Sequence, residues 1–201
     1  MTPRKRWVLA TSNRGKVAEL SALLAQAGLD FGVTAQSELG VEPPPETGAT
    51  FVENALLKAR HAARITALPA IADDSGLVVR ALGGAPGVRS ARFAGEGAGD
   101  RANTAKLLEA LAAPSLDRSA CFYCVLVALE HPDDPAPMIV TGAWRGRIAA
   151  APKGEGGFGY DPVFSDPASG RTAAELSAAE KNRVSHRGAA VRALVECLKN
   201  R

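Results

Sequence analysis

The chain has 201 residues, of which 46% are hydrophobic, and a formal net charge of +3 at pH 7. This length and apolar content exclude an intrinsically disordered protein, and we expect residues 1–201 to form a single globular domain. Lys and Arg residues are scattered along the sequence, which argues against a dedicated nucleic-acid-binding surface. Three cysteines are too few and odd in number for a disulfide framework.

The N-terminal segment 1–6 is basic, as in a signal peptide, but the apolar segment that follows it ends at Thr11. That segment is too short for a signal peptide, and no other stretch is continuously apolar over the length of a membrane span. We therefore expect a cytoplasmic protein with neither a membrane partner nor a stable nucleic-acid partner.

The first expected elements are a strand over residues 7–11 and a helix that begins near Lys16 and ends at Gly28. The loop between them has the spacing Thr-x-Asn-x-x-Lys, with Thr11, Asn13 and Lys16. Backbone N–H groups at the start of a helix, together with these side chains, favour a bound phosphate. A Walker A loop is excluded because Val17 stands where Ser or Thr is needed. A solvated loop with a surface lysine is the alternative.

A strand is expected over residues 31–35 and a helix over residues 50–65, with Glu46 just before that helix. Glu46, Glu53 and Lys58 are candidate functional residues. The alternative for Glu46 is that it complements the helix dipole, and the alternative for Glu53 is a helix-capping arrangement with Thr50.

The segment 71–77 places Asp73 and Asp74 side by side after an apolar run, followed by Ser75 and Gly76. We expect a strand over residues 70–72, so that the two carboxylates lie at its C-terminal end, and a short second strand over 77–79. Neighbouring carboxylates repel unless a cation or a shared proton compensates them, so the pair indicates a divalent metal or acid/base chemistry. A simple turn is the alternative.

In the second half of the chain, a helix is expected over residues 100–111 and two long strands over 119–130 and 138–148. The polar connection between the strands predicts an antiparallel hairpin, and the whole sheet is then mixed. The segment 154–162 is glycine-rich and contains Phe158 and Tyr160, either of which is able to stack on a base. A glycine-rich hairpin corner is the alternative.

The closing helix is expected to begin after Ser185, its N-cap, with His186 and Arg187 in the first turn. Cations there oppose the helix dipole, which suggests that an anionic or carbonyl-rich partner holds them. A solvated turn is the alternative.

Taken together, five segments resemble the inosine triphosphate pyrophosphatase family, which hydrolyses non-standard purine nucleoside triphosphates. The resemblance covers nearly the whole chain, in the order of the family. It rests on Thr-Ser-Asn-Arg-Gly-Lys at 11–16, Glu-Asn-Ala at 53–55 with Lys-Ala at 58–59, Ala-Asp-Asp-Ser-Gly-Leu at 72–77, Gly-Gly-Phe-Gly-Tyr-Asp-Pro at 156–162, and Glu-Lys at 180–181 with Ser-His-Arg at 185–187.

The resemblance implies an elongated α/β fold with a central mixed β-sheet, flanking helices and two lobes around an active-site cleft, usually as a homodimer. It implies an enzyme that converts ITP, dITP or XTP to the monophosphate and pyrophosphate with Mg²⁺, by attack of water at the α-phosphorus. The alternatives are a Maf-type pyrophosphatase for modified nucleotides and a non-catalytic nucleotide-binding module.

The resemblance also implies roles for individual residues. Asp74 would be the catalytic base and a metal ligand, with Glu46 and Asp73 as further metal ligands and Glu42 and Glu53 as alternatives to Glu46. The implied substrate contacts are Thr11, Ser12, Asn13, Arg14, Gly15, Lys16, Lys58, Ser75, Phe158, Gly159, Tyr160, Asp161, Lys181, His186 and Arg187.

Overall fold

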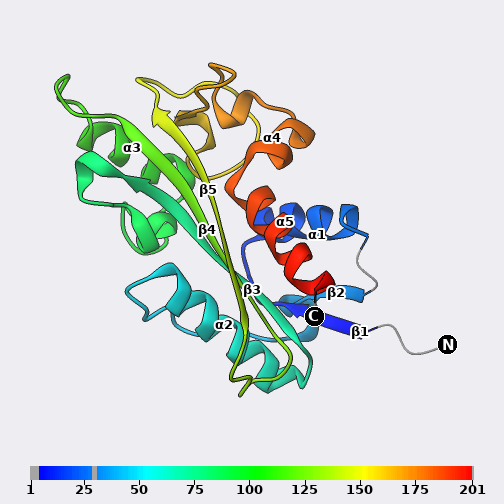
Figure 1. The fold of residues 1–201 in the computed structure, drawn as a ribbon. Coiled ribbons are helices and arrows are strands. Elements are labelled where there is room, and N and C mark those ends of the chain that lie inside the picture. The colour runs from blue at the N-terminus through cyan, green and yellow to red at the C-terminus, as the bar shows by residue number, and fades with distance from the viewer. Residues whose placement is uncertain (1–4, 29–30, 201) are drawn as a thin grey trace. The chain divides into compact units, whose positions relative to one another are not determined.

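The structure is a computed structural model that describes residues 5–28 and 31–200 (Figure 1). Residues 1–4 of the basic N-terminal segment lie outside the described residues. The strands form a six-stranded sheet in the order β2-β1-β3-β4-β5-β6. Their bounds are β1 (Lys5–Leu9), β2 (Phe31–Ala35), β3 (Ala70–Val79), β4 (Ser119–Leu129), β5 (Met138–Ile148) and β6 (Phe164–Ser165).

The α-helices are α1 (Arg14–Gln26), α2 (Phe51–Thr66), α3 (Asp100–Ala110), α4 (Ala178–Val184) and α5 (His186–Lys199). Strand β1 is parallel to both β2 and β3, whereas β5 is antiparallel to β6. The predicted mixed α/β sheet is therefore confirmed, and the two long strands of the expected hairpin are neighbours in it.

The chain divides into two compact units. The first unit consists of Met1–Asp74, Cys124–Gly142 and Arg187–Arg201, and the second of Ser75–Tyr123 and Ala143–His186. Strands β3, β4 and β5 each contribute residues to both units.

The core of the first unit combines side chains of β1, β3 and β4 with apolar side chains of α1 and α5. Helix α1 contributes Leu20 and Leu24, and helix α5 contributes Val191 and Leu194. Helix α2 contacts β1 and buries a row of small residues, Ala55, Ala59, Ala62 and Ala63. The elements that carry the candidate phosphate loop and the aspartate pair are thus fixed by close packing.

The core of the second unit is built around aromatic side chains. The ring centroid of Phe122 lies 4.4 Å from that of Phe164, and the Trp144 centroid lies 4.9 Å from that of Phe164. Tyr160 belongs to this core and is only 4% exposed. Its hydroxyl donates a hydrogen bond to the Ser90 carbonyl at 2.9 Å.

Helix starts follow the capping residues of the sequence. Asn13 caps α1, because its Oδ1 accepts the Lys16 N–H at 3.0 Å. Thr50 and Glu53 form a capping box at the start of α2, as the capping alternative for Glu53 anticipates. Ser185 lies between α4 and α5, and its N–H closes α4 by bonding the Lys181 carbonyl at 2.8 Å.

The prediction that a strand ends before Asp73 is wrong. Strand β3 is one continuous strand of 10 residues, and Asp73 and Asp74 lie in its middle. Parallel pairing with β1, in contrast, covers only Ala70 and Ile71 of β3. The carboxylates follow the end of this pairing, and successive side chains on a strand point to opposite faces. Each carboxylate therefore reaches cations on its own side, which removes the need for a turn.

Among residues 5–28 and 31–200, no helix is long and apolar enough to cross a membrane.

Candidate active site

The loop between β1 and α1 presents the start of a 13-residue helix. It is anchored to β3 by a hydrogen bond from the Ala10 N–H to the Ile71 carbonyl at 2.7 Å. Thr11 Oγ1 accepts the Asn13 N–H at 3.4 Å, so the loop turns tightly into the helix. The first turn of α1 contains no acidic residue, which leaves the positive end of its dipole uncompensated there. This arrangement favours an anion such as a phosphate.

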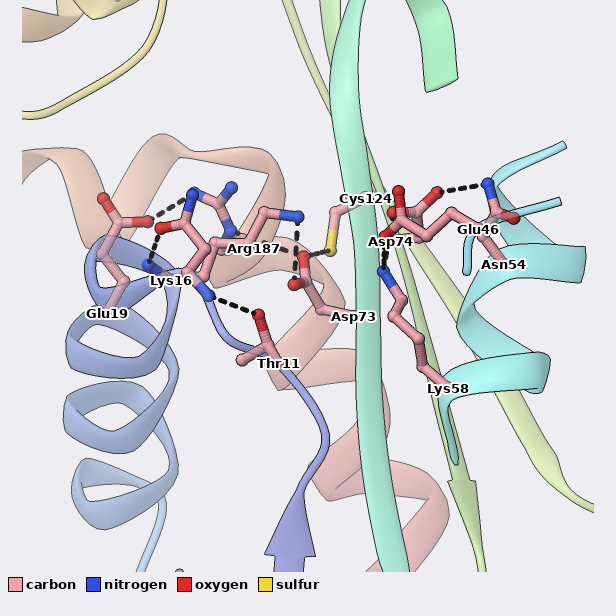
Figure 2. A network of polar contacts seen from close by, with 11 residues as sticks. Thr11, Lys16, Glu19, Glu46, Asn54, Lys58, Asp73, Asp74, Cys124 and Arg187 are labelled. Carbon is pink, nitrogen blue, oxygen red and sulfur yellow. Dashed lines mark hydrogen bonds and ion pairs between the residues drawn. The ribbon is translucent and has the colours of Figure 1, made fainter. Parts of the chain in front are cut away.

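The Asp74 carboxylate lies on one face of β3, between Lys58 and Asn54 of helix α2 (Figure 2). Lys58 Nζ lies 2.8 Å from Asp74 Oδ1 and also 2.8 Å from Glu46 Oε1. Asn54 Nδ2 lies 3.4 Å from Asp74 Oδ2. One ammonium therefore holds two carboxylates that would otherwise repel each other.

Burial shapes the protonation of this group. Burial raises the pKa of the Asp74 carboxyl above its ordinary range, and the charges of Lys58 and Lys16 offset only part of that rise. For Lys58, burial by itself lowers the ammonium pKa, but the carboxylates of Asp74, Asp73 and Glu46 outweigh burial and raise it. A carboxylate with a raised pKa is a better proton acceptor, which suits Asp74 to a role as a base.

The Asp73 carboxylate lies on the opposite face of β3, among different partners (Figure 2). Its Oδ1 lies 3.2 Å from Lys16 Nζ, and its Oδ2 lies 3.7 Å from Arg187 Nε. Arg187 Nη1 also donates to Glu19 Oε2 at 2.5 Å. The anionic partner predicted for the first turn of the closing helix is thus confirmed for Arg187, and two acids balance two bases in this group.

The three predicted metal ligands do not form one cluster. Glu46 and Asp74 share the Lys58 ammonium, whereas Asp73 faces Lys16 and Arg187. Within the described part of the chain, no three His, Cys, Asp or Glu side chains gather in a way that would hold a metal. Mg²⁺ usually takes only one or two protein carboxylates and completes its shell with water and substrate phosphates. Asp74 and Glu46 fit that requirement.

The alternative glutamates have other contacts. Glu53 Oε2 accepts hydrogen bonds from the Thr50 N–H and hydroxyl, both at 2.8 Å, and these bonds lower the pKa of its carboxyl. The backbone carbonyl of Glu42 lies 2.9 Å from His61 Nε2. Of the three glutamates, Glu46 is the one that reaches the Lys58 ammonium.

In the second unit, Asp161 organises the glycine-rich segment. Its Oδ2 accepts the Lys181 ammonium at 2.6 Å and the Phe158 N–H at 2.9 Å. A Cβ atom at Gly157 would overlap this oxygen, and Gly157 has a φ of +73°, so glycine is required there. Lys181 Nζ lies 5.0 Å from the centroid of the Phe158 ring. A carboxylate, an ammonium and an aromatic ring are thus brought together.

Other residues that are predicted to contact the substrate make contacts within the protein. Tyr160 is a core residue, which leaves Phe158 as the more accessible ring of the two. The Gly159 N–H donates to Asp100 Oδ2 at 2.7 Å. His186 is buried, and its ring stacks on Phe122 at 4.8 Å between centroids. All the substrate contacts that the resemblance implies stay predictions, including those of Ser12, Arg14, Gly15 and Ser75.

Sequence reasoning missed Asn54 and Glu19 as parts of this constellation. Asn54 is completely buried although it is polar, and it stands four residues before Lys58 on the same face of α2. That i,i+4 spacing was the available signal for Asn54. Glu19 had no local signal, because Arg187, its partner, lies 168 residues further along the chain.

A comparison with protein-family models matches residues 7–197 to the Ham1 family. The chain belongs to the Ham1 family. This Ham1 chain is 57% identical over 194 residues to the dITP/XTP pyrophosphatase of Escherichia coli (strain K12), covering 96% of the chain and 98% of that protein. It is 59% identical over 191 residues to the dITP/XTP pyrophosphatase of Xanthomonas campestris pv. campestris, covering 94% and 95%.

Solved structures agree with the Ham1 fold. A HAM1 protein from Coxiella burnetii has a TM-score of 0.90 at 51% identity, covering 98% of this chain and 100% of that one. The Ham1 protein of Staphylococcus aureus has a TM-score of 0.85 at 41% identity, covering 98% and 99%. The predicted family and fold class are therefore confirmed.

Proposed function

We propose that this Ham1 protein hydrolyses the non-standard purine nucleoside triphosphates dITP, ITP and XTP to the monophosphate and pyrophosphate. The observation that carries the proposal is its identity of 57–59%, over 94–96% of the chain, to proteins named dITP/XTP pyrophosphatase. Water attacks the α-phosphorus, and the bond from that phosphorus to the oxygen bridging it to the β-phosphorus breaks. The bridging oxygen leaves with pyrophosphate.

Asp74 is the proposed base. Its carboxylate is 5% exposed and is oriented through both oxygens, Oδ1 by Lys58 and Oδ2 by Asn54. A carboxylate held in this way accepts a proton from a water molecule without reorienting during the reaction. The raised pKa of Asp74 supports this assignment.

The loop at residues 11–16 is the proposed triphosphate site. The first N–H groups of α1, with Thr11, Asn13 and the Lys16 ammonium, supply donors and positive charge for phosphate oxygens. Lys58 supplies a second cation, which offsets the charge that develops as pyrophosphate leaves.

Asp74 and Glu46 are the proposed Mg²⁺ ligands, because their oxygens suit a hard cation and lie close enough to share one ammonium. When bound, Mg²⁺ would neutralise charge on the phosphate oxygens. Asp73, the third predicted ligand, has the Lys16 and Arg187 cations as its partners, so the proposed pair is Asp74 and Glu46.

For the base, we propose contacts with Phe158, Lys181, His186 and Arg187. Donors that face a 6-keto oxygen favour hypoxanthine and xanthine, whereas the 6-amino group of adenine would leave donors unpaired. A homodimer, which the family resemblance implies, and a cytoplasmic location, which the sequence predicts, remain predictions.

The test is an assay of purified protein with dITP, ITP, XTP, GTP and ATP that measures pyrophosphate and orthophosphate separately, with and without Mg²⁺. We expect Mg²⁺-dependent release of pyrophosphate, with the kcat/KM for dITP exceeding that for ATP by about 10⁴ or more, the scale of discrimination by unpaired donors. Preference for a modified pyrimidine triphosphate would indicate a Maf-type enzyme. Binding without release of pyrophosphate would indicate a non-catalytic module.

A further inference from the structure

Asn54 is a completely buried polar residue that would itself neither transfer a proton nor bind the metal in the proposed chemistry. A buried amide costs free energy unless both its donor and its acceptor are satisfied. The contacts that satisfy Asn54 lead to the two acidic residues of the candidate active site.

The first contacts are with the backbone of Gly48. Asn54 Oδ1 accepts the Gly48 N–H at 2.8 Å, and Asn54 Nδ2 lies 3.4 Å from the Gly48 carbonyl. Gly48 is two residues after Glu46, so this contact fixes the segment that carries the Glu46 carboxylate. The approach is close: a Cβ atom at Gly48 would lie 2.7 Å from Asn54 Oδ1 and 2.7 Å from Glu53 Cβ.

The second contact is with the proposed base. Asn54 Nδ2 lies 3.4 Å from Asp74 Oδ2, a long hydrogen bond, while Lys58 holds the other oxygen of the same carboxylate at 2.8 Å (Figure 2). Catalytic hydrogen bonds are often long without substrate and tighten in the reacting complex. Asn54 and Lys58, one helical turn apart on α2, thus divide the two oxygens of Asp74 between them, and both also hold the Glu46 segment.

We propose that Asn54 is a positioning residue, which sets the orientation of the Asp74 carboxylate and the place of Glu46 relative to it. The proposal rests on the proposed pyrophosphohydrolase function. Asn54 acts through Asp74 and has no part in holding the triphosphate, which is the task of the loop at residues 11–16.

The test compares two buried asparagines of the same chain. Asn103 of α3 is 2% exposed and also clamps a loop backbone: its Oδ1 accepts the Ala94 N–H at 2.8 Å, and its Nδ2 donates to the Ala91 carbonyl at 3.1 Å. Neither of these two bonds involves a carboxylate. Asn54→Leu and Asn103→Leu remove equivalent backbone bonds and leave the net charge unchanged, so both lose stability for the same reason.

For Asn54→Leu we expect kcat for dITP to fall 10- to 100-fold, the usual cost of losing a residue that supports a catalytic or metal-binding side chain. We expect KM to stay within about 3-fold, and the Kd for inorganic tripolyphosphate, measured by calorimetry without Mg²⁺, to stay within about 2-fold. Asn103→Leu should keep kcat within about 3-fold of wild type. When Asn54→Leu is combined with Asp74→Asn, kcat should fall by less than about 2-fold below that of Asp74→Asn alone, because both changes act on one carboxylate.

Gly48→Ala disturbs the same contact and keeps the amide of Asn54, since the new methyl group would lie 2.7 Å from both Asn54 Oδ1 and Glu53 Cβ, and the segment around Gly48 must shift away from the start of α2. It should show the same pattern of lowered kcat and unchanged tripolyphosphate binding. The role of Asn54 is overturned if kcat in Asn54→Leu matches that in Asn103→Leu, if tripolyphosphate binding weakens in parallel with kcat, or if the loss is fully additive with Asp74→Asn. Those three outcomes leave the proposed function intact. Absence of pyrophosphate release by the wild type, in contrast, overturns the proposed function and with it the role of Asn54.

Discussion

Replacing Lys58 with methionine removes the cation that Asp74 and Glu46 share and keeps a side chain of similar length. Lys58 is 6% exposed, and its ammonium lies 2.8 Å from an oxygen of each carboxylate. Removing one partner of a buried ion pair costs about 3–5 kcal/mol. Because the Glu46 side chain is 28% exposed and therefore partly screened, we take the lower end, about 3 kcal/mol.

For a chain of this length, each kcal/mol lowers Tm by roughly 2–4 °C, so we expect Lys58→Met to lower it by about 6–12 °C. Thermal unfolding followed by circular dichroism at pH 7 without metal measures this shift. The matched control is Arg64→Met, on the same helix α2. Arg64 pairs with Asp133 at 3.2 Å, but the two side chains are 62% and 84% exposed, so the pair is worth at most about 1 kcal/mol.

The same Tm measurement repeated with Mg²⁺ tests the proposed metal ligands. If Asp74 and Glu46 are the metal ligands, Lys58→Met removes the ammonium that occupies them, and Mg²⁺ should raise the Tm of this variant more than that of wild type. A ligand present at 100 times its Kd stabilises by about 2.7 kcal/mol, which is comparable with the loss. Equal destabilisation by Lys58→Met and Arg64→Met would refute the argument from burial. If Mg²⁺ changes the Tm of neither wild type nor Lys58→Met, the choice of Asp74 and Glu46 as metal ligands is refuted.

Three further predictions concern individual residues. Asp74→Asn should lower kcat for dITP by about 10²–10⁴-fold at saturating Mg²⁺, the range for loss of a general base, and near-normal turnover would contradict its role. Phe158→Ala should lower kcat/KM for dITP by about 5- to 150-fold, since stacking on a base is worth ~1–3 kcal/mol. The control Phe93→Ala, whose ring also has a lysine ammonium 5.0 Å from its centroid, should leave kcat/KM unchanged, and equal losses would argue against stacking on Phe158. Hydrogen bonds from Arg171 and Ser177 lower the pKa of Glu180 from 4.5 to about 2. The ionised Glu180 carboxylate therefore contributes to the free energy of unfolding above about pH 4.5, and this contribution is lost as pH falls through about 2. Glu180→Gln should flatten the dependence of Tm on pH in this window, and parallel curves for variant and wild type would contradict it.

The fold was largely predictable because its helices and strands carry local signals. The 31–35 strand matches β2, and the capping pair Thr50 and Glu53 marks the start of α2. The course of β3 was not predictable in this way. Two adjacent aspartates followed by Ser75 and Gly76 resemble a turn locally, and only cations from α1, α2 and α5 allow the chain to stay extended there.

In the candidate site, too, some residues carry a local sequence signal and others depend on tertiary contacts. Thr11, Asn13 and Lys16 are close in sequence, so their spacing around a strand-to-helix loop is a local signal that favours a phosphate, with a solvated loop as the alternative. The separation of Asp73 from Asp74 follows in principle from strand geometry, once the strand is known to continue. The contacts of Asn54 with Gly48 and of Glu19 with Arg187 depend on tertiary packing, which no local pattern encodes.

The ion pair between Glu19 and Arg187 joins two segments that the ribosome synthesises far apart in time. Its two partners are 168 residues apart, and the first unit is assembled from the start, the middle and the end of the chain. A ribosome-bound chain has already exposed Asp73 and Glu19 before the codon for Arg187 is read. Until α5 docks, those two carboxylates lack their guanidinium, and the core lacks Val191 and Leu194. The first unit therefore completes its fold only after α5 has been synthesised, and long-range closure of this kind slows folding.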